Sequence, residues 1–259
     1  MMFMTEPQPS DGFEWAQAPW GSVLRCRPLL AVAPHFFTAA SLRLREDATE
    51  WEKVALFAGV AADRVRLLRQ VHGHAVAISR AGTSQLWGIP EADGVISDDP
   101  SAALAVRVAD CAPILMADRR RGVAAAVHAG WRSTLQRIVA DAVTGLGREF
   151  DTNPADLVVA IGPCLGACCG EMGEEVVAAF REAGHGEDRI DRWFSRVPGR
   201  RPHFDLWRAN TDQLQDAGVP LESIHVSGLC TRTHDRIFHS YRARGSDAGR
   251  MVGVIRARG

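Results

Sequence analysis

Three apolar segments of this chain each end near a side chain that can bind a metal ion. In the segment VAAAVHAGWR, Val123–Arg132, an apolar run ends in His128 and is followed by a small-residue turn and a predicted helix. The segments LLRQVHG and LAVRVADC place His72 and Cys111 at comparable positions. Short apolar runs bounded by glycine, proline and aspartate are typical of buried strands. The three strand ends are therefore expected to meet at one pole of a sheet.

Two imidazoles and one thiol form a ligand set that suits zinc. Three protein ligands leave the fourth position of the ion for water or substrate, which is typical of catalytic zinc. The alternative is that each residue serves packing alone, with His128 bonded to a backbone carbonyl and Cys111 a small core residue. As a nucleophile, Cys111 would need a neighbouring base such as His128 or His72.

Copper is less expected than zinc. His72 and His74 form a His-x-His pair on a predicted strand, where both side chains point to one face. A multicopper oxidase needs a His₂Cys centre and a separate histidine-rich cluster, and the nine scattered histidines of this chain do not supply both.

The pattern of apolar and polar residues indicates one α/β domain with mixed β-sheets flanked by helices. We expect a flexible N-terminal arm over residues 1–20, a single domain over 21–259 and a mobile charged connection over 187–203. A capping box of Ser133 and Gln136 predicts the start of a helix that ends at Gly147. The other predicted helices cover 46–59, 171–183 and 206–217. Strands are predicted over 22–30, 65–71, 75–78, 94–97, 103–108, 114–117, 123–127, 157–161, 224–227, 237–241 and 251–255.

Composition limits the possible partners. The formal net charge is −1 over 259 residues, which gives no electrostatic reason to expect nucleic acid. No apolar run approaches the roughly 20 residues of a membrane span, and the start lacks a signal-peptide pattern. We therefore expect a cytoplasmic protein, a monomer or weak homo-oligomer, with reduced thiols and a small-molecule ligand.

Two groups of residues outside the three strand ends are further candidate sites. Arg132 and the C-terminal Arg242 and Arg250 suit phosphate or ribose if they lie near His128; otherwise they belong to a charged surface. Cys164, Cys168 and Cys169 lie in GPCLGACCG, but no second close pair completes four ligands, so a turn that packs small thiols is expected there.

The ordered motifs RQVHG, ADGVIS, ADC, HAGWR, IGPCLGACCGEMGEEV and SYRARG…GRM resemble the YfiH or laccase-domain family, whose members have been called polyphenol oxidases and purine nucleoside phosphorylases. The resemblance implies a fold of the cytotoxic-necrotizing-factor/YfiH type and a zinc site on His72, Cys111 and His128. It also implies phosphorolysis of adenosine, inosine and methylthioadenosine, together with adenosine deamination.

Within this resemblance each candidate residue receives a role. For deamination, a zinc-bound water attacks the purine C6 while Asp110 or Asp93 shuttles protons. For phosphorolysis, arginines and helix-end amides position phosphate against the ribose C1′. The candidate catalytic residues are Cys111, His128, Asp110 and Arg132, and the candidate substrate-binding residues are Arg69, Asp93, Arg242 and Arg250.

The chain departs from the family pattern in two places. The segment His35–Asp47 is shortened and lacks the usual glycines and asparagine, and Ser133 stands where glycine is usual. Divergent specificity or loss of nucleoside activity is therefore one expectation. Two other functions stay open: a Cys/His amide hydrolase linked to peptidoglycan precursor editing, and a metal-binding protein without turnover.

Overall fold

The computed structural model describes residues 6–82 and 87–258 as an α/β protein with mixed sheets, as the sequence predicted. The strands are β1 Phe13–Ala18, β2 Gly21–Cys26, β3 His35–Thr38, β4 Val65–Arg66, β5 Val76–Ser79, β6 Gly94–Ser97, β7 Ala103–Val108, β8 Ala112–Asp118, β9 Ala124–Ala129, β10 Leu157–Ile161, β11 Phe194–Ser195, β12 His203–Phe204, β13 Ile224–Val226 and β14 Met251–Arg256. The helices are α1 Arg27–Leu30, α2 Ala48–Ala58, α3 Trp131–Leu135, α4 Ile138–Phe150, α5 Glu174–Glu182, α6 Glu187–Trp193, α7 Leu206–Asp216 and α8 Tyr241–Arg244.

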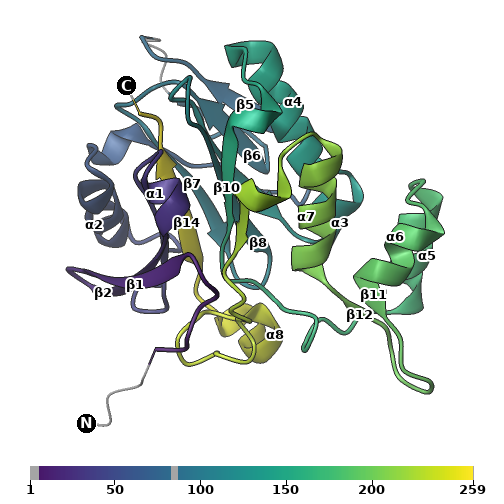
Figure 1. Ribbon diagram of the computed structural model, residues 1–259. Coiled ribbons are helices and arrows are strands. Elements are labelled where there is room, and N and C mark those ends of the chain that lie inside the picture. The colour runs from purple at the N-terminus through teal and green to yellow at the C-terminus, as the bar shows by residue number, and fades with distance from the viewer. Residues whose placement is uncertain (1–5, 83–86, 259) are drawn as a thin grey trace.

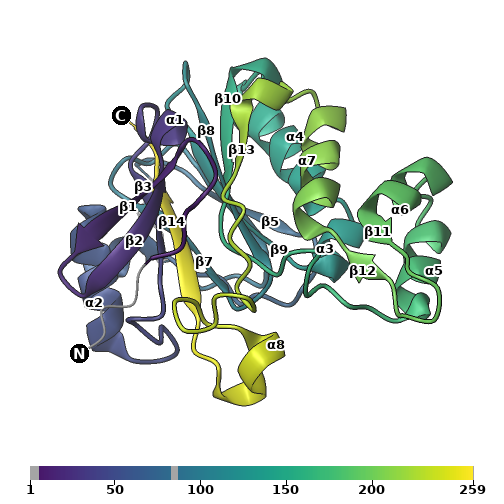
Figure 2. The same ribbon diagram turned by 60° about the horizontal axis from the view of Figure 1, so that its bottom comes forward.

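Two large sheets pack face to face between helices (Figures 1 and 2). The first sheet has the strand order β1-β2-β3-β14-β7-β4, and the second has the order β13-β10-β8-β9-β6-β5. Helix α2 covers the outer face of the first sheet, while α4 and α7 cover the outer face of the second. Helices α5 and α6 lie beyond α7, and α8 lies at one end of the sheets.

Strand β9 shows why the second sheet is apolar on both faces. Ala124 and Ala126 belong to the core between the two sheets, whereas Ala125 and Val127 belong to the core under α4 and α7. All four residues are fully buried. A strand buried on both faces appears in the sequence as a continuous apolar run rather than as an alternating pattern. His128 is thereby delivered at the end of a rigid, fully packed strand.

The chain crosses from the first sheet to the second at two points, and each crossing carries a candidate ligand. Residues 67–75 connect β4 to β5 and contain His72, and residues 109–111 connect β7 to β8 and contain Cys111. Both crossings include a non-glycine residue in the left-handed region, His72 at φ +60° and Asp110 at φ +85°. Such conformations are uncommon and occur often at functional sites.

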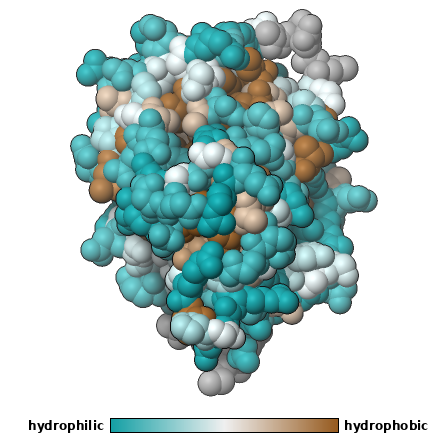
Figure 3. Space-filling model, turned by 90° about the vertical axis from the view of Figure 1, so that its right-hand side faces the viewer, coloured by the Kyte–Doolittle hydropathy of each residue, from teal (hydrophilic) through white to brown (hydrophobic). Residues whose placement is uncertain are grey.

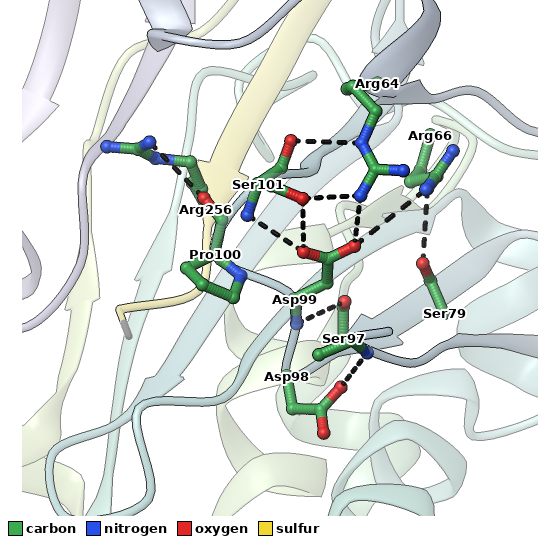
Figure 4. Close-up of polar contacts among 10 residues, drawn as sticks. Arg64, Arg66, Ser79, Ser97, Asp98, Asp99, Pro100, Ser101 and Arg256 are labelled. Atoms are coloured by element: carbon green, nitrogen blue, oxygen red, sulfur yellow. Dashed lines mark hydrogen bonds and ion pairs between the residues drawn. The ribbon is translucent and has the colours of Figure 1, made fainter. Parts of the chain in front are cut away.

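A polar network fixes both ends of the first crossing (Figure 4). Asp99 is buried and accepts a hydrogen bond of 2.6 Å from Arg64, with the buried Arg66 guanidinium 4.0 Å away. Arg66, the last residue of β4, also donates from Nε to the Ser79 hydroxyl at 3.2 Å, and Ser79 is the last residue of β5. The network therefore ties the edges of the two sheets together on either side of the segment that carries His72.

His35 on β3 is a buried histidine whose two ring nitrogens are both used. Nε2 accepts from the Cys26 backbone N–H at 3.0 Å, and Nδ1 donates to the Ala33 carbonyl at 3.0 Å. This pairing needs the neutral imidazole, because a second ring proton would face another donor. Burial lowers the pKa of His35 from 6.5 to about 4.

The N-terminal region differs from the flexible arm expected over residues 1–20. Phe13–Ala18 forms the edge strand β1 in an antiparallel hairpin with β2, since Phe13 is buried and Trp15 stacks on Phe238 at a centroid distance of 5.9 Å. Residues 1–5 of the expected arm lie outside the described residues. The strand predicted over 22–30 ends at Cys26, because the short helix α1 begins at Arg27 with Pro28 in its first turn.

The expected mobile connection over 187–203 contains helix α6, strand β11 and the first residue of β12, with which β11 forms a hairpin. Its charged residues face outward, whereas Ile190 and Trp193 are buried, and the Trp193 indole donates to Asp212 at 2.8 Å. The strand predicted over 237–241 is also wrong. That segment leads into helix α8, whose first turn is capped by the Ser240 hydroxyl.

The capping box predicted at Ser133 does not form. Helix α3 begins earlier, at Trp131, and the helical run is broken at Arg137, which has φ +60°. Ser133 lies inside α3 with a buried hydroxyl that has no hydrogen-bond partner among the described residues. The helix that the apolar pattern indicated is therefore two helices, α3 and α4, joined by a sharp turn.

The outer surface is mostly hydrophilic on the side that carries α5 and α6, where apolar side chains appear in separate patches (Figure 3). Among the helices of residues 6–82 and 87–258, none combines the length and the apolar character needed to cross a bilayer.

Candidate metal centre and cavity

Strand register places Cys111 and His128 side by side. In the antiparallel pair β8 and β9, Pro113 is opposite His128 and Ala112 is opposite Ala129, so Cys111 comes opposite Gly130. The His72 ring packs edge-on against His128 with 4.9 Å between ring centroids. The donor atoms of His72, Cys111 and His128 all lie within 4.8 Å of one another. The three predicted ligands are thus brought together at one point.

Gly130 of the HAGWR motif makes this approach possible. A Cβ atom at position 130 would lie 2.7 Å from the Cys111 sulfur and 3.3 Å from Cδ2 of His72. The first distance is far below van der Waals contact, and the sulfur belongs to a side chain fixed by the turn before β8. Glycine is required here because of close packing, since its φ of −84° is accessible to any residue.

Asp93 orients the site from below. It precedes β6, is fully buried, and accepts a 2.7 Å hydrogen bond at Oδ1 from Nδ1 of His128. The same carboxylate accepts backbone N–H groups from Val71 at 3.1 Å, His72 at 3.0 Å and Gly73 at 2.7 Å. One side chain therefore fixes both the ring orientation of His128 and the backbone that carries His72, and leaves Nε2 of His128 directed at the cavity.

The charges within the site reinforce one another. Burial alone raises the pKa of the Cys111 thiol, but the charge of His128 and hydrogen bonds from both histidines outweigh it and lower that pKa from 9.0 to about 6. Burial alone lowers the pKa of His128, but the Cys111 thiolate and Asp93 raise it from 6.5 to about 9. Burial likewise opposes ionisation of Asp93, yet its bonds to His128 and Gly73 give a lowered pKa. The thiol is thus poised to ionise, as a metal ligand must be.

The three donors lie in the lining of a cavity of about 950 Å³. His128 is buried, Cys111 is half-buried and His72 is exposed, so the site is closed below and open to the cavity above. The other lining residues are Arg45, Glu46, Gln70, Arg107, Ala109, Asp110, Gly130, Trp131, Arg132, Leu165, Gly170, Met172, Phe204, Leu206, Tyr241, Arg242, Ser246 and Arg250. A cavity of this size, with apolar walls and a few convergent polar groups, suits a small-molecule ligand.

Three arginines form a basic cluster in this cavity. Burial lowers the pKa of Arg107, and the positive charge of Arg250 lowers it further. Burial likewise lowers the pKa of Arg250, with the charge of Arg45 as the next cause. Arg45 donates to the Ala248 carbonyl at 2.6 Å and Arg250 donates to the same carbonyl at 3.0 Å, which holds the two side chains in place. Partly desolvated arginines that repel one another favour binding of an anion.

Asp110 connects helix α8 to the turn that carries Cys111. Its Oδ1 accepts from the Thr231 hydroxyl at 2.6 Å, and its Oδ2 accepts from the Arg242 backbone N–H at 2.5 Å. The Arg242 guanidinium in turn donates to the Cys169 carbonyl at 3.0 Å. These bonds hold α8, which provides Tyr241 and Arg242, against the turn that carries Cys111.

The remaining predicted residues occupy different positions. Arg132 lines the cavity and stacks on Trp131, with its guanidinium carbon 4.3 Å from the ring centroid. Arg69 is exposed, pairs with Glu91 and is not among the lining residues that the structure describes. Asp93 lies beneath the site, not in the lining, and acts there on His128 and the backbone of the His72 segment.

Sequence reasoning missed Arg45 and Arg107. Arg107 had a visible signal, because it is a charged residue within the otherwise apolar strand of LAVRVADC. Arg45 lies in the shortened segment 35–47 and reaches the cavity through the turn before α2, where the Glu50 carboxylate accepts the backbone N–H of Leu44 at 2.6 Å. The departure from the family pattern therefore still delivers a residue to the cavity.

The donor set fits a divalent metal. Imidazole nitrogen and thiolate sulfur are the ligand types that zinc prefers. The hydrogen bond between His128 and Asp93 is the kind of carboxylate contact that commonly orients a metal-binding histidine. Fold and site together define the chain as an α/β protein with three candidate metal ligands that open into a basic cavity.

A family model described as multi-copper polyphenol oxidoreductase laccase matches residues 46–258, and the chain belongs to this family. A protein of Deinococcus radiodurans named "Purine nucleoside phosphorylase" is 37% identical over 92% of this chain and 94% of that protein. A protein of the same name from Bacteroides thetaiotaomicron is also 37% identical, over 63% of this chain and 60% of that protein. A protein named "Adenosine deaminase RL5", from an unknown prokaryotic organism, is 32% identical over 78% of this chain and 79% of that protein.

Two solved structures share the fold. YfiH of Bacillus licheniformis superposes with a TM-score of 0.84 at 25% identity and covers 96% of this chain and 100% of that one. YlmD of Geobacillus stearothermophilus has a TM-score of 0.83 at 28% identity and covers 95% of this chain and 99% of that one. The predicted family and fold class are therefore confirmed. The names of the relatives support an enzyme of this family with activity like that of a purine nucleoside phosphorylase.

Proposed function

We propose that the protein is a zinc-dependent purine nucleoside phosphorylase that acts on adenosine, inosine and methylthioadenosine and also deaminates adenosine. The observation that carries this proposal is the open His72–Cys111–His128 site inside a cavity lined by arginines and aromatic rings. The names of the relatives point to the same substrate class.

His72, Cys111 and His128 are the residues that would hold zinc. A zinc ion in such a site lowers the pKa of a bound water and polarises a substrate oxygen or nitrogen. The chain itself supplies the remaining functions: Asp93 fixes the His128 ring, and Gly130 leaves room for the Cys111 sulfur. Zinc is favoured over copper because two imidazoles and one thiolate with an open position match its catalytic sites.

The basic cluster is the proposed phosphate site. Arg45, Arg107 and Arg250 present several N–H donors, and bidentate contacts from a guanidinium match the oxygens of phosphate. Binding of phosphate would relieve the repulsion between the three arginines. Arg132 and Arg242, at other positions in the lining, would then contact the nucleoside or the developing ribose 1-phosphate.

The aromatic lining is the proposed site for the base. Trp131, Phe204 and Tyr241 offer ring faces on which a planar purine can stack, and Met172 and Leu206 add apolar surface. Stacking holds the base without distinguishing adenine from hypoxanthine, which agrees with a substrate range that includes both.

Asp110 is the proposed group that exchanges protons with the substrate. It lines the cavity next to Cys111, whereas Asp93 is fully buried and all of its hydrogen-bonding capacity faces His128 and the backbone. A general acid or base must reach the substrate directly or through one water. Of the two carboxylates weighed from the sequence, only Asp110 meets that requirement.

The test is to incubate the purified zinc-loaded protein with adenosine, with and without phosphate, and to separate the products by chromatography. We expect the free bases adenine and hypoxanthine only when phosphate is present, and inosine as the only product when phosphate is absent. Cys111→Ala should abolish both reactions, while Cys168→Ala, a thiol outside the cavity lining, should leave both unchanged. Absence of any product from a protein that retains zinc would instead support the metal-binding protein without turnover.

A Cys/His amide hydrolase is the second candidate, and one observation favours it. Cys111, His128 and Asp93 lie in the order nucleophile, base and orienting carboxylate, with the Asp93–His128 bond at 2.7 Å. In this reaction the Cys111 sulfur attacks an amide carbon, and His128 passes a proton to the leaving amine. Added zinc distinguishes the two functions. A zinc ion bound to the Cys111 sulfur prevents that sulfur from acting as a nucleophile, so zinc should inhibit a hydrolase and activate a phosphorylase.

A further inference from the structure

Three cysteine sulfurs gather at a second point, outside the cavity lining. Cys168 and Cys169 follow β10, Cys230 follows β13, and the three sulfurs lie within 4.8 Å of one another. The sulfurs of Cys168 and Cys169 are 3.6 Å apart. Cys164, which the sequence grouped with them, instead directs its sulfur toward the Leu165 carbonyl. Cys230, 66 positions after Cys164 in the sequence, takes its place in the cluster, which no local spacing could indicate.

The backbone holds Cys230 at the base of this cluster. Cys164 and Cys230 form a parallel β-bridge, and the Gly166 N–H donates to the Cys230 sulfur at 3.3 Å. A Cβ at position 166 would lie 3.3 Å from the Cys230 Cβ and 2.8 Å from the Trp207 ring. Glycine is thus required for the loop to approach the sulfur, and an N–H donor stabilises a thiolate.

The three thiols of the cluster differ in their exposure to solvent. Cys168 is exposed and Cys169 is half-buried, whereas Cys230 is buried. The Thr233 hydroxyl lies 3.5 Å from the Cys168 sulfur and 3.6 Å from the Cys169 sulfur, which closes the fourth side. The cluster is therefore a small group of sulfurs closed at the base and open to solvent at the rim, so that an ion can enter it.

We propose that Cys168, Cys169 and Cys230 form a second metal site that binds a soft, thiophilic ion, monovalent copper. Three sulfurs bonded to one ion at about 2.3 Å lie about 4 Å apart, so the observed separations need little rearrangement. Thiolates without imidazole or carboxylate partners select soft ions, and a structural zinc site would require a fourth protein ligand. Binding releases the thiol protons, and the copper keeps its oxidation state throughout.

This site shares no ligand with the first one. The two are linked through hydrogen bonds that reach Asp110: Arg242 donates from its guanidinium to the Cys169 carbonyl and from its backbone N–H to Asp110, and Thr231, which follows Cys230, donates from its hydroxyl to Asp110. None of these three bonds involves a cysteine sulfur. Loss of the second site should therefore leave metal binding at His72, Cys111 and His128 intact, which makes the two sites separable by experiment.

The experiment titrates monovalent copper into the full-length, metal-free protein without oxygen, in competition with a chromogenic copper chelator. A Cys111→Ala background removes the thiolate of the first site. We expect one equivalent of copper per chain and near-ultraviolet absorption from sulfur-to-copper charge transfer. Adding Cys168→Ser with Cys169→Ser should weaken binding at least about 100-fold, because even loss of an outer contact to a metal ligand costs about 10–100-fold.

The matched control is Cys164→Ser in the same background, which changes a neighbouring thiol and leaves the three sulfurs in place. It should bind copper as tightly as the background protein, and circular dichroism verifies that each variant is folded. A parallel titration with zinc completes the comparison. The proposal is overturned if the Cys168→Ser, Cys169→Ser variant retains the copper affinity, or if the cluster binds zinc and rejects monovalent copper.

Discussion

Replacing Asp93 by asparagine tests whether one buried carboxylate organises the metal site. The change keeps the size of the side chain and removes its charge. In the structure, Oδ1 accepts from the His72 N–H and from Nδ1 of His128, and Oδ2 accepts from the N–H groups of Val71 and Gly73. Whichever way the asparagine amide is turned, its NH₂ group faces two donors. With His128 kept in the tautomer that donates from Nδ1, two of the four hydrogen bonds are therefore lost.

The magnitude follows from this count. A hydrogen bond to a charged group contributes about 1.5–3 kcal/mol, so losing two lowers the free energy of unfolding by about 3–6 kcal/mol. The orientation of His128 is weakened at the same time, and loss of such a carboxylate contact lowers metal affinity about 10–100-fold. The matched control is Asp98→Asn, because Asp98 follows the same strand β6 at its other end and accepts one backbone hydrogen bond, from Ala81 at 2.7 Å. Its cost should be about 1 kcal/mol.

Urea unfolding of wild type and both variants, with the metal removed by a chelator, measures the first effect without the contribution of bound ion. Zinc competition titrations measure the second. If Asp93→Asn unfolds at the same urea concentration as Asp98→Asn and binds zinc as tightly as wild type, then Asp93 does not organise the site and the reasoning is refuted.

Three further predictions concern other parts of the molecule. The folded protein holds His35 neutral, with its pKa lowered from 6.5 to about 4. As the pH falls, the His35 ring is therefore protonated in the unfolded chain before it is protonated in the folded protein. The stability that the neutral ring contributes above pH 6.5 is lost as the pH falls to 4. Urea unfolding should show a loss of about 3 kcal/mol across this window, and His35→Gln should flatten the profile. Gly130→Ala places a methyl group 2.7 Å from the Cys111 sulfur, and kcat/KM should fall about 100-fold; an unchanged value would contradict the packing argument. Arg107→Met should raise the KM for phosphate and leave deamination unchanged, as steady-state kinetics can show.

The sequence singled out His72, Cys111 and His128 as candidate ligands because each lies at the end of an apolar run. The structure brings their donor atoms together, although His72 lies on the connection between β4 and β5 and not at a strand end. The sequence alone could not show why these side chains come into contact. Cys111 approaches His128 because β8 pairs antiparallel with β9 and places Cys111 opposite Gly130, a register set by pairing across the chain. The role of Asp93 likewise depends on backbone groups of a loop about 20 residues earlier, which no spacing rule encodes.

The errors in the fold have physical causes of the same kind. The segment 187–203 appeared mobile because charged residues dominate it, yet a few buried side chains such as Trp193 fix it against α7. The strand β1 was missed because its inward residues, Phe13 and Trp15, pack on partners far away in the chain. In both cases long-range packing outweighed local composition.

The distribution of charge in the cavity bears on which reaction dominates. Among residues 6–82 and 87–258, the lining contains five arginines and two carboxylates, although the chain as a whole has a formal net charge of −1. Such a concentration of positive charge attracts anions and costs stability unless an anion binds. A nucleoside is neutral, and deamination of adenosine needs no anion, so this basic cavity would be of no use to a deaminase alone. In the proposed phosphorolysis, phosphate is the substrate that would bind there. Arg45, which the segment that departs from the family pattern supplies to this cavity, therefore supports the proposal that phosphorolysis is the main reaction and deamination the secondary one.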